Sequence, residues 1–273
     1  MHILFDLGKT KTRIAGSAEL ESFLEPRIFE TPKTYEEAIG LIVKTAKEIA
    51  NGSEIESVAG GIGCPVEKKT HTLVGGLNFP TWDGKLFQDD LHRKINVPVF
   101  LENDSALVGL GEAVHGAGKD ADIMAYITVS TGVGGVRIVH KKIDENTYGF
   151  EPGWQVLSLG TDGIYASDFL SGRSVEKETG KNANEIMNPL FWDEKARILA
   201  GFLNNVIVMW SPDTVVVGGS MMKEIGIPLA SAEKYLKDIL KIFPHIPVIK
   251  KAELHDIGGL WGAMEFLKQK KNL

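Results

Sequence analysis

Three consecutive polar residues, Glu102, Asn103 and Asp104, separate an apolar strand pattern at Val97–Leu101 from an apolar helical pattern that starts at about Ser105. An aspartate before a helix commonly caps its first turn. A carboxylate at the end of a strand is also placed to accept a proton from an attacking hydroxyl, as general-base catalysis requires. Capping does not need three such groups together, and the set suits a hydroxyl-rich substrate. Both interpretations of Asp104 stay open.

Two turns rich in Gly and Thr, Asp6–Thr12 and Thr128–Gly135, each lie between two strand patterns. Backbone N–H groups and hydroxyls in such turns can hold phosphate oxygens, and glycine lets the backbone approach them closely. Either turn alone could carry these residues only for its geometry. Because the device occurs twice, we favour phosphate binding. The carboxylate of Asp6 could hold Mg²⁺, usually through water.

Two further segments have polar or aromatic groups suited to ligands. Val215–Ser220 is a buried strand pattern running into Gly218 and Gly219, which suits a nucleotide or simply a strand-to-helix turn. Asn78–Trp82 joins an amide to an indole, a pair that fits the hydroxyl edge and the apolar face of a sugar. The alternative for this segment is a surface loop with a tucked Trp.

The elements around these segments predict an α/β protein. A capping box at Thr34 and Glu37 begins a helix that Asn51-Gly52 ends. The other expected helices are near 85–94, 105–114, 193–210, 228–242 and 260–268, and the buried strands include 58–63, 123–129, 214–217 and 247–250. The strand, turn, strand unit recurs in both halves, which indicates an internally duplicated fold with two lobes. A length of 273 residues suits two lobes.

Composition excludes several classes of protein. A formal net charge of -6 argues against a nucleic-acid surface. The single cysteine, Cys64, permits neither an internal disulfide nor a thiolate zinc site, and its apolar surroundings predict a buried thiol. The chain has no signal-peptide pattern at its start and no apolar run of about 20 residues. We therefore expect a cytoplasmic protein with no membrane partner.

Taken together, these segments resemble the ROK family (repressor, open reading frame, kinase) of the actin-like ATPase superfamily, in the right order over nearly the whole chain. Asp6-Leu7-Gly8-Lys9-Thr10 is similar to its first phosphate loop, and Ser130–Gly135 to its second. Glu102-Asn103-Asp104 resembles its catalytic motif. The similar sugar-binding and adenosine segments are Leu77–Trp82, Glu151–Trp154 and Val217–Ser220.

The resemblance implies a two-lobe, ribonuclease H-like fold with the active site in the cleft between the lobes. The first lobe would be residues 1–105, completed by the C-terminal helix 259–273, and the second lobe 106–258. The first lobe would carry the sugar loop and the first phosphate loop, and the second lobe the second phosphate loop and the adenosine loop.

The resemblance also implies ATP-dependent phosphorylation of a hexose or hexose derivative, with Asp104 taking the proton of a hydroxyl, typically on C6. The sugar would be bound by Asn78, Glu102, Asn103, Glu151 and Trp154. ATP would be bound by Asp6, Gly8, Lys9, Thr10, Lys11, Thr131, Gly132, Gly134, Gly218 and Gly219, with Asp6 also positioning Mg²⁺.

The chain departs from the family pattern at several positions. Lys9 replaces a usual Gly, and Trp154 replaces a His that binds sugar and zinc in many members. Leu157–Gly172 contains no Cys, and Ser167 stands where a sugar-binding Glu is usual, so no zinc is expected. Trp154 could stack on a sugar or be a core aromatic. The repressor branch is not favoured, because no helix-turn-helix pattern precedes the first strand.

Two alternatives to a sugar kinase remain. The changed residues at 154 and 167 would suit a non-catalytic sensor of sugar or nucleotide, although the retained Asp6 and Asp104 count against it. Another actin-like ATPase is disfavoured by the sugar-side segments. The sequence leaves open the sugar, the hydroxyl, the phosphate donor (ATP or polyphosphate) and the oligomeric state, for which the resemblance makes a homodimer one option.

Overall fold

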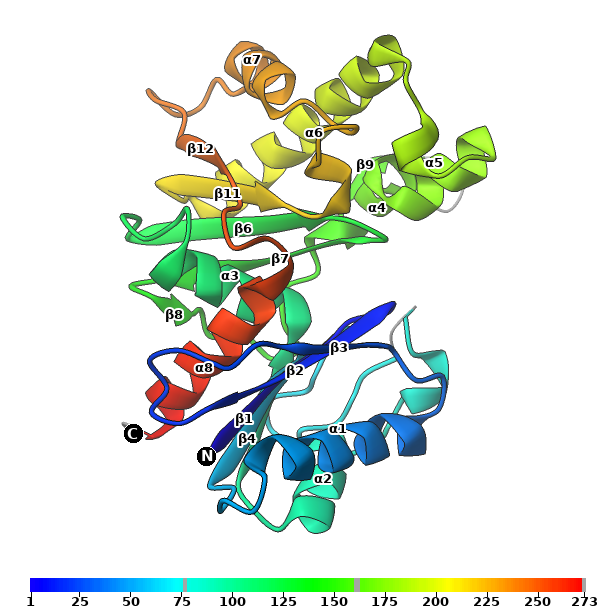
Figure 1. Cartoon of the computed structure of the whole chain (residues 1–273). Helices are drawn as coiled ribbons and strands as arrows, with labels where there is room; N and C mark the ends of the chain where they lie inside the picture. The colour runs from blue at the N-terminus through cyan, green and yellow to red at the C-terminus, as the bar shows by residue number, and fades with distance from the viewer. Residues whose placement is uncertain (76–77, 160–162, 272–273) are drawn as a thin grey trace. The chain divides into compact units, whose positions relative to one another are not determined.

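The computed structural model describes residues 1–75, 78–159 and 163–271, in two compact units (Figure 1). The first unit is Met1–Val114, Glu145–Gly149 and Asp256–Leu273, and the second is His115–Asp144 and Phe150–His255. Each unit has its own five-stranded sheet and its own apolar core.

The sheet of the first unit has the strand order β3-β2-β1-β4-β5, with β1 at His2–Leu7, β2 at Lys11–Ser17, β3 at Arg27–Glu30, β4 at Ser57–Ile62 and β5 at Val99–Asn103. The strands β1, β2 and β3 are antiparallel, whereas β4 and β5 run parallel to β1. The helices α1 (Tyr35–Ala50) and α2 (Phe87–Ile95) cover one face, and α8 (Gly258–Lys271) covers the other (Figure 1). The carboxyl ends of β1, β4 and β5 therefore lie at one edge of this sheet.

The sheet of the second unit repeats this topology, in the order β12-β11-β6-β7-β8. Its strands are β6 (Ile123–Val129), β7 (Val133–Val139), β8 (Lys142–Ile143), β11 (Thr214–Gly218) and β12 (Val248–Lys251). Again β6 pairs with β7 in an antiparallel hairpin and with β11 in parallel, and β12 follows β11. The predicted duplication is confirmed by this topology.

The remaining elements of the second unit surround that sheet. Two helices, α6 (Pro189–Trp210) and α7 (Leu229–Ile239), pack on each other. A short sheet of β9 (Val156–Ser158) and β10 (Ile164–Tyr165) leads to α4 (Ala166–Leu170) and α5 (Gly172–Thr179). Short 3₁₀ turns lie at Pro80–Trp82, Pro152–Trp154, Ala183–Glu185, Ser220–Met222 and His255–Ile257.

The ends of most helices and strands agree with the local sequence signals, except at the junction of β5 and α3, which belongs to the candidate site. Thr34 and Glu37 form the expected capping box of α1, and Asn51 ends the helix in the left-handed conformation. β5 runs two residues further than expected, to Asn103, because it pairs with β4 as far as Ile62. Helix α3 (Asp104–His115) therefore begins at Asp104 rather than at Ser105. No helix in the described part of the chain is long and apolar enough to cross a membrane.

Candidate functional site

Asp104 is the first residue of α3, directly after the end of β5. Its Oδ1 accepts hydrogen bonds from the backbone N of Ser105 (2.6 Å) and from the Ser105 hydroxyl (3.3 Å). Its Oδ2 lies on the side of Gly63, where a Cβ atom would be 3.1 Å away. Burial raises the pKa of Asp104, which makes the carboxylate a stronger base. One oxygen is thus held by the chain while the other stays available to a ligand.

The cap of α3 comes from Asn103 rather than from Asp104. Oδ1 of Asn103 accepts from the backbone N of Ala106 at 3.1 Å, the bond that an N-cap side chain makes. Its Nδ2 donates to the backbone O of Cys64 at 3.3 Å. The helix cap that the sequence allowed at Asp104 is therefore made by Asn103, one residue earlier, and Asp104 does not cap the helix. Cys64 is buried, as predicted.

Asp6 lies near the end of β1 and is only 8% exposed. Burial, followed by the negative charge of Asp104, raises the pKa of Asp6 to about 7. Arg13 on β2 opposes this rise through an Nη1–Oδ2 contact of 3.4 Å. The start of α8 packs closely on the same carboxyl, because a Cβ atom at Gly259 would lie 2.8 Å from its Cγ. Two acidic side chains of the first unit, the buried Asp6 and the partly buried Asp104, therefore interact electrostatically.

Asn78 and the first phosphate turn are held by contacts that the sequence analysis did not anticipate. Asn78 Nδ2 donates to the backbone O of Gly63 at 2.9 Å, next to Asp104 Oδ2. The turn Gly8–Lys11 closes through the Gly8 N to Lys11 O bond (3.1 Å), and the hydroxyl of Thr31 on the neighbouring strand segment donates to Gly8 O at 2.7 Å. The side chains of Lys9, Thr10 and Lys11 are exposed at the tip.

Glu102 points into the protein. It is 5% exposed and forms an ion pair with Lys68, and its Oε1 also accepts from the backbone N of Asn103 at 2.8 Å. The sequence analysis did not select Lys68. The only signal for it would have been a lysine in the turn after β4, which has no periodicity of its own.

The indole of Trp82 is part of the core. It is 1% exposed and stacks on Phe79, with ring centroids 4.3 Å apart. It also contacts Phe87 of α2 and Tyr35 of α1. The expectation that this indole covers a sugar face is therefore wrong, whereas Asn78 lies beside the Asp104 carboxylate. Leu77, the first residue of the predicted sugar loop, lies outside the described residues.

In the second unit, the turn Ser130–Gly135 meets the turn that follows β11, at Gly218–Ser220. The hydroxyls of Ser130 and Ser220 are 2.9 Å apart. Gly219 has a φ of +100°, and any Cβ there would collide with the backbone O of Val129 at the end of β6. The predicted nucleotide residues of this unit, Thr131, Gly132, Gly134, Gly218 and Gly219, therefore gather at the carboxyl ends of β6 and β11 and the start of β7.

Arg173 is a cation at this second turn that the sequence analysis did not select. It is the second residue of α5, and its Nε donates to the backbone O of Thr131 at 3.1 Å. Its Nη2 lies 3.5 Å from the position of a Cβ at Gly132. The preceding Gly172 N donates to Ser130 O at 2.7 Å, so α5 begins on the turn.

Glu151 precedes the tight 3₁₀ turn Pro152–Trp154, and Trp154 is the last residue of this turn. Gly153 has no room for a side chain, because a Cβ would meet the backbone of Val133 and would lie 2.5 Å from Ser167 Oγ. Trp154 is 49% exposed and makes an edge-to-face contact with Tyr165, at 4.9 Å between centroids. The alternative that Trp154 is a core aromatic is therefore wrong.

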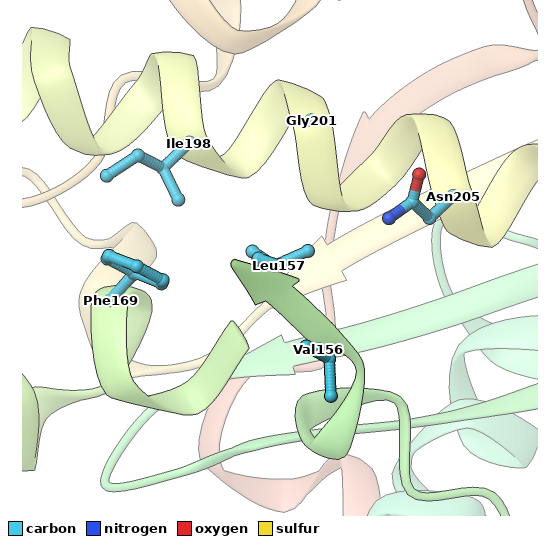
Figure 2. A pocket seen from close by; sticks show the side chains of 6 residues that line it. All are labelled: Val156, Leu157, Phe169, Ile198, Gly201 and Asn205. Carbon is cyan, nitrogen blue, oxygen red and sulfur yellow. The ribbon is translucent and has the colours of Figure 1, made fainter. Parts of the chain in front are cut away.

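A pocket of about 370 Å³ lies in the second unit, away from these turns. Figure 2 shows its lining, which comes from β9, α4 and one face of α6: Val156, Leu157, Phe169, Ile198, Gly201 and Asn205. None of the predicted site residues lines it, although Val156 follows Trp154 by two positions. An apolar lining without a titratable group offers no chemistry for group transfer.

The carboxylate of Asp6 is the candidate for holding a magnesium ion. In the described ranges, no three or more His, Cys, Asp or Glu side chains are grouped so that they could hold a metal ion on their own. Mg²⁺ usually keeps several waters and takes only one or two carboxylates together with phosphates. A cation would also oppose the effects of burial and of the Asp104 charge, which together raise the pKa of Asp6.

Two duplicated sheets, each with a Gly-rich hairpin turn, and a carboxylate at the end of β5 define a two-lobe actin-like ATPase fold. The ROK family model matches residues 3–154 and 166–270. The chain therefore belongs to the ROK family. The match is interrupted between residues 154 and 166, where β9 and β10 lie. This interruption overlaps Leu157–Gly172, the segment that lacks the cysteines of the family's zinc loop.

Individual relatives agree over almost the full length. The glucokinase of Thermotoga maritima is 26% identical, over 97% of this chain and 96% of the relative. The N-acetyl-D-glucosamine kinase of Citrobacter koseri is also 26% identical, over 96% and 98%. The crystal structure of a ROK family glucokinase from Streptomyces griseus, in complex with glucose and AMPPNP, has a TM-score of 0.81 at 24% identity and covers 98% of this chain and 99% of its own.

Proposed function

We propose that this protein transfers the γ-phosphate of ATP to a hydroxyl, on C6, of a hexose or hexose derivative. The observation that carries the proposal is the arrangement of the Asp104 carboxylate and its raised pKa. Its Oδ1 is fixed by Ser105, its Oδ2 lies beside Gly63 and Asn78, and burial raises its pKa. Family membership and the named activities of the relatives support a sugar as the acceptor.

Each step of the reaction has a residue in this chain. Asn78 and Asn103 would orient the sugar, with Glu151 and Trp154 as further contacts. Oδ2 of Asp104 accepts the proton of the attacking hydroxyl as the oxygen forms its bond to the γ-phosphorus and the bond to ADP breaks. The turns at Gly8–Lys11 and Ser130–Gly134, with Gly218 and Gly219, would bind the nucleotide. Mg²⁺, when bound, neutralises negative charge on the phosphates, and Asp6 would position it through water.

The lobe assignment follows from the same proposal. Residues 1–105 with the C-terminal helix would carry the sugar and the first phosphate turn, and residues 106–258 the second phosphate turn and the adenosine turn. Residues 272 and 273 of the expected C-terminal helix lie outside the described part of the chain.

The proposal is tested by coupled ADP release over a panel of sugars that includes glucose, mannose and their N-acetylated 2-amino derivatives. Asp104→Asn should lower kcat by about 100- to 10,000-fold, the range of general-base contributions. Asp89→Asn is a matched control, because Asp89 is also an aspartate in the first turn of a helix but is exposed. An unchanged rate in Asp104→Asn would refute the role of Asp104.

A non-catalytic sensor is the alternative, and Trp154 in place of the family His favours it. Calorimetry separates the two functions. If the protein binds a sugar but releases no ADP from ATP with any sugar of the panel, the result would support the sensor and contradict the kinase.

A further inference from the structure

The ion pair of Lys68 with Glu102 lies one residue from the proposed sugar ligand and two from the proposed base. The carboxylate of Glu102 is buried, and its Oε1 accepts from both Lys68 Nζ and Asn103 N, so this oxygen is held by the chain.

We propose that Lys68 is a positioning residue for phosphoryl transfer, acting through Glu102 on Asn103 and Asp104. The inference rests on the proposed kinase function and deepens it, since it gives Glu102 the task of supporting the two residues that follow.

Lys68 is delivered by a turn that is itself fixed. The backbone N of Glu67 donates to Thr72 O at 2.9 Å, and the N of His71 donates to Glu67 O at 2.8 Å. The turn is closed by a bridge between Val66 and Leu73, both of which are buried. The ammonium group of Lys68 therefore reaches Glu102 from a constrained backbone rather than from a free surface loop.

The backbone of Lys68 makes a second long-range bond. Its N donates to Thr147 O at 2.9 Å, within the segment Glu145–Gly149 that belongs to the first unit. Both ends of the lysine are thus engaged, and its side chain is 26% exposed.

Glu102 transmits this constraint to the site over a short path. The peptide N–H of Asn103 bonds to Glu102 Oε1, the Asn103 side chain caps α3, and Asp104 is the next residue. The backbone there has little freedom, because a Cβ at Gly61 of β4 would lie 2.9 Å from the Cα of Asp104. A shift of the Glu102 carboxylate would therefore move the peptide that precedes Asp104, and catalysis is sensitive to displacements of about 1 Å.

Charge matters as well as position. Without Lys68, the buried carboxylate of Glu102 would lack its cationic partner, and a buried charge without a partner is strongly unfavourable. The carboxylate would turn toward water, and this change would remove or weaken its bond to Asn103 N. The effect should fall on the sugar side and leave nucleotide binding intact, because the residues involved are sugar-side residues.

The experiment compares Lys68→Met, Lys68→Arg, Glu102→Gln and the double variant Lys68→Met with Glu102→Gln, alongside wild type. Lys69→Met is the matched control, since Lys69 is the exposed neighbour in the same turn. For each variant, kcat, the KM for sugar, the KM for ATP and the unfolding midpoint are measured with the best sugar of the panel.

We expect Lys68→Met to lower kcat about 10- to 100-fold, the range that a misplaced catalytic group causes, with the KM for ATP unchanged. Lys68→Arg should retain most of the wild-type kcat, because arginine keeps the positive charge next to Glu102. The double variant should lose no more than Lys68→Met alone, because the two residues act as one unit. If Lys68→Met does not fold, the arginine and double variants carry the same comparison.

Three results would overturn the inference. The first is a normal kcat in Lys68→Met with only a lower unfolding midpoint, which is a structural role. The second is an equal loss in Lys69→Met, and the third is additive losses in the double variant. Absence of sugar kinase activity in wild type would refute the proposed function and this inference with it, whereas an active wild type with an unaffected Lys68→Met would refute the inference alone.

Discussion

A Cβ atom at Gly63 would lie 3.1 Å from Oδ2 of Asp104, so the absence of a side chain at residue 63 keeps the unbonded carboxylate oxygen accessible. The same Cβ would be 3.5 Å from Nδ2 of Asn78 and from the ring of Phe79. Gly63 follows the end of β4 by one residue, and thus sits between the proposed base and a proposed sugar ligand.

Gly63→Ala should therefore reduce sugar phosphorylation without disturbing the nucleotide. The added methyl group forces its neighbours to move by a few tenths of an ångström, and we expect kcat/KM for the sugar to fall about tenfold, which corresponds to roughly 1.4 kcal/mol. Steady-state kinetics with either substrate varied measures this. Gly40→Ala in α1 is the control, because a Cβ there has no neighbour within 4 Å. An equal loss in both variants would show that the effect is not local to Asp104.

The raised pKa of Asp6 predicts how stability depends on pH. Because the pKa of the folded state, about 7, exceeds the ordinary value of 3.8, the folded chain binds more protons than the unfolded chain between these values. Stability in the absence of divalent cations should therefore fall as the pH rises from about 4 to about 7. Asp6→Asn removes this loss, so its advantage over wild type should grow with pH, to an upper limit of roughly 4 kcal/mol at pH 8.

Urea unfolding at pH 5, 6, 7 and 8 in a chelator measures the dependence. The control is Asp256→Asn, since Asp256 also contacts Arg13, at 3.9 Å, but is exposed. Mg²⁺ should stabilise wild type more at pH 8 than at pH 5, and Asp6→Asn should not show this response. A constant difference between Asp6→Asn and wild type across the pH series would contradict the assigned pKa.

Arg173 should contribute to nucleotide affinity, because it places a guanidinium on the turn Ser130–Gly132. Hydrogen bonds to charged groups contribute about 1.5–3 kcal/mol, so Arg173→Gln should raise the dissociation constant of ATP by roughly 10- to 100-fold. Arg173→Lys should raise the dissociation constant of ATP less than Arg173→Gln does, because lysine keeps the positive charge. Calorimetric titration with ATP measures the dissociation constant of each variant. Arg197→Gln is the control, because Arg197 is on the exposed face of α6.

Trp154 should act on the sugar and not on the fold. Because its indole is about half exposed, Trp154→Ala should change stability by no more than about 0.5 kcal/mol, as for other surface substitutions. If the ring stacks on a sugar face, the KM for sugar should rise about fivefold or more, since aromatic contacts contribute about 0.5–1.5 kcal/mol beyond burial. Trp154→Phe should retain most of the affinity. A KM unchanged in Trp154→Ala would remove Trp154 from the sugar site.

Patterns confined to short stretches predicted much of the fold. The α1 capping box, the two hairpins and the polar residues after β5 were visible because turns and caps depend on neighbours within three or four residues. The duplication followed from the recurrence of one strand, turn, strand unit. Its confirmation needed the strand order, since pairing of β1 with β4 and of β6 with β11 joins segments more than 50 residues apart.

The sequence by itself determined the family, the two sheets and the candidate base, because these depend on residue type and order. The tertiary structure decided which side chains are free to act. It buried Trp82, left Trp154 exposed, turned Glu102 toward Lys68 and gave the cap of α3 to Asn103. Lys68 and Glu102 are 34 residues apart, and Arg173 and Thr131 are 42 apart. No local period links such pairs, so only the packing of distant strands and turns could bring them together.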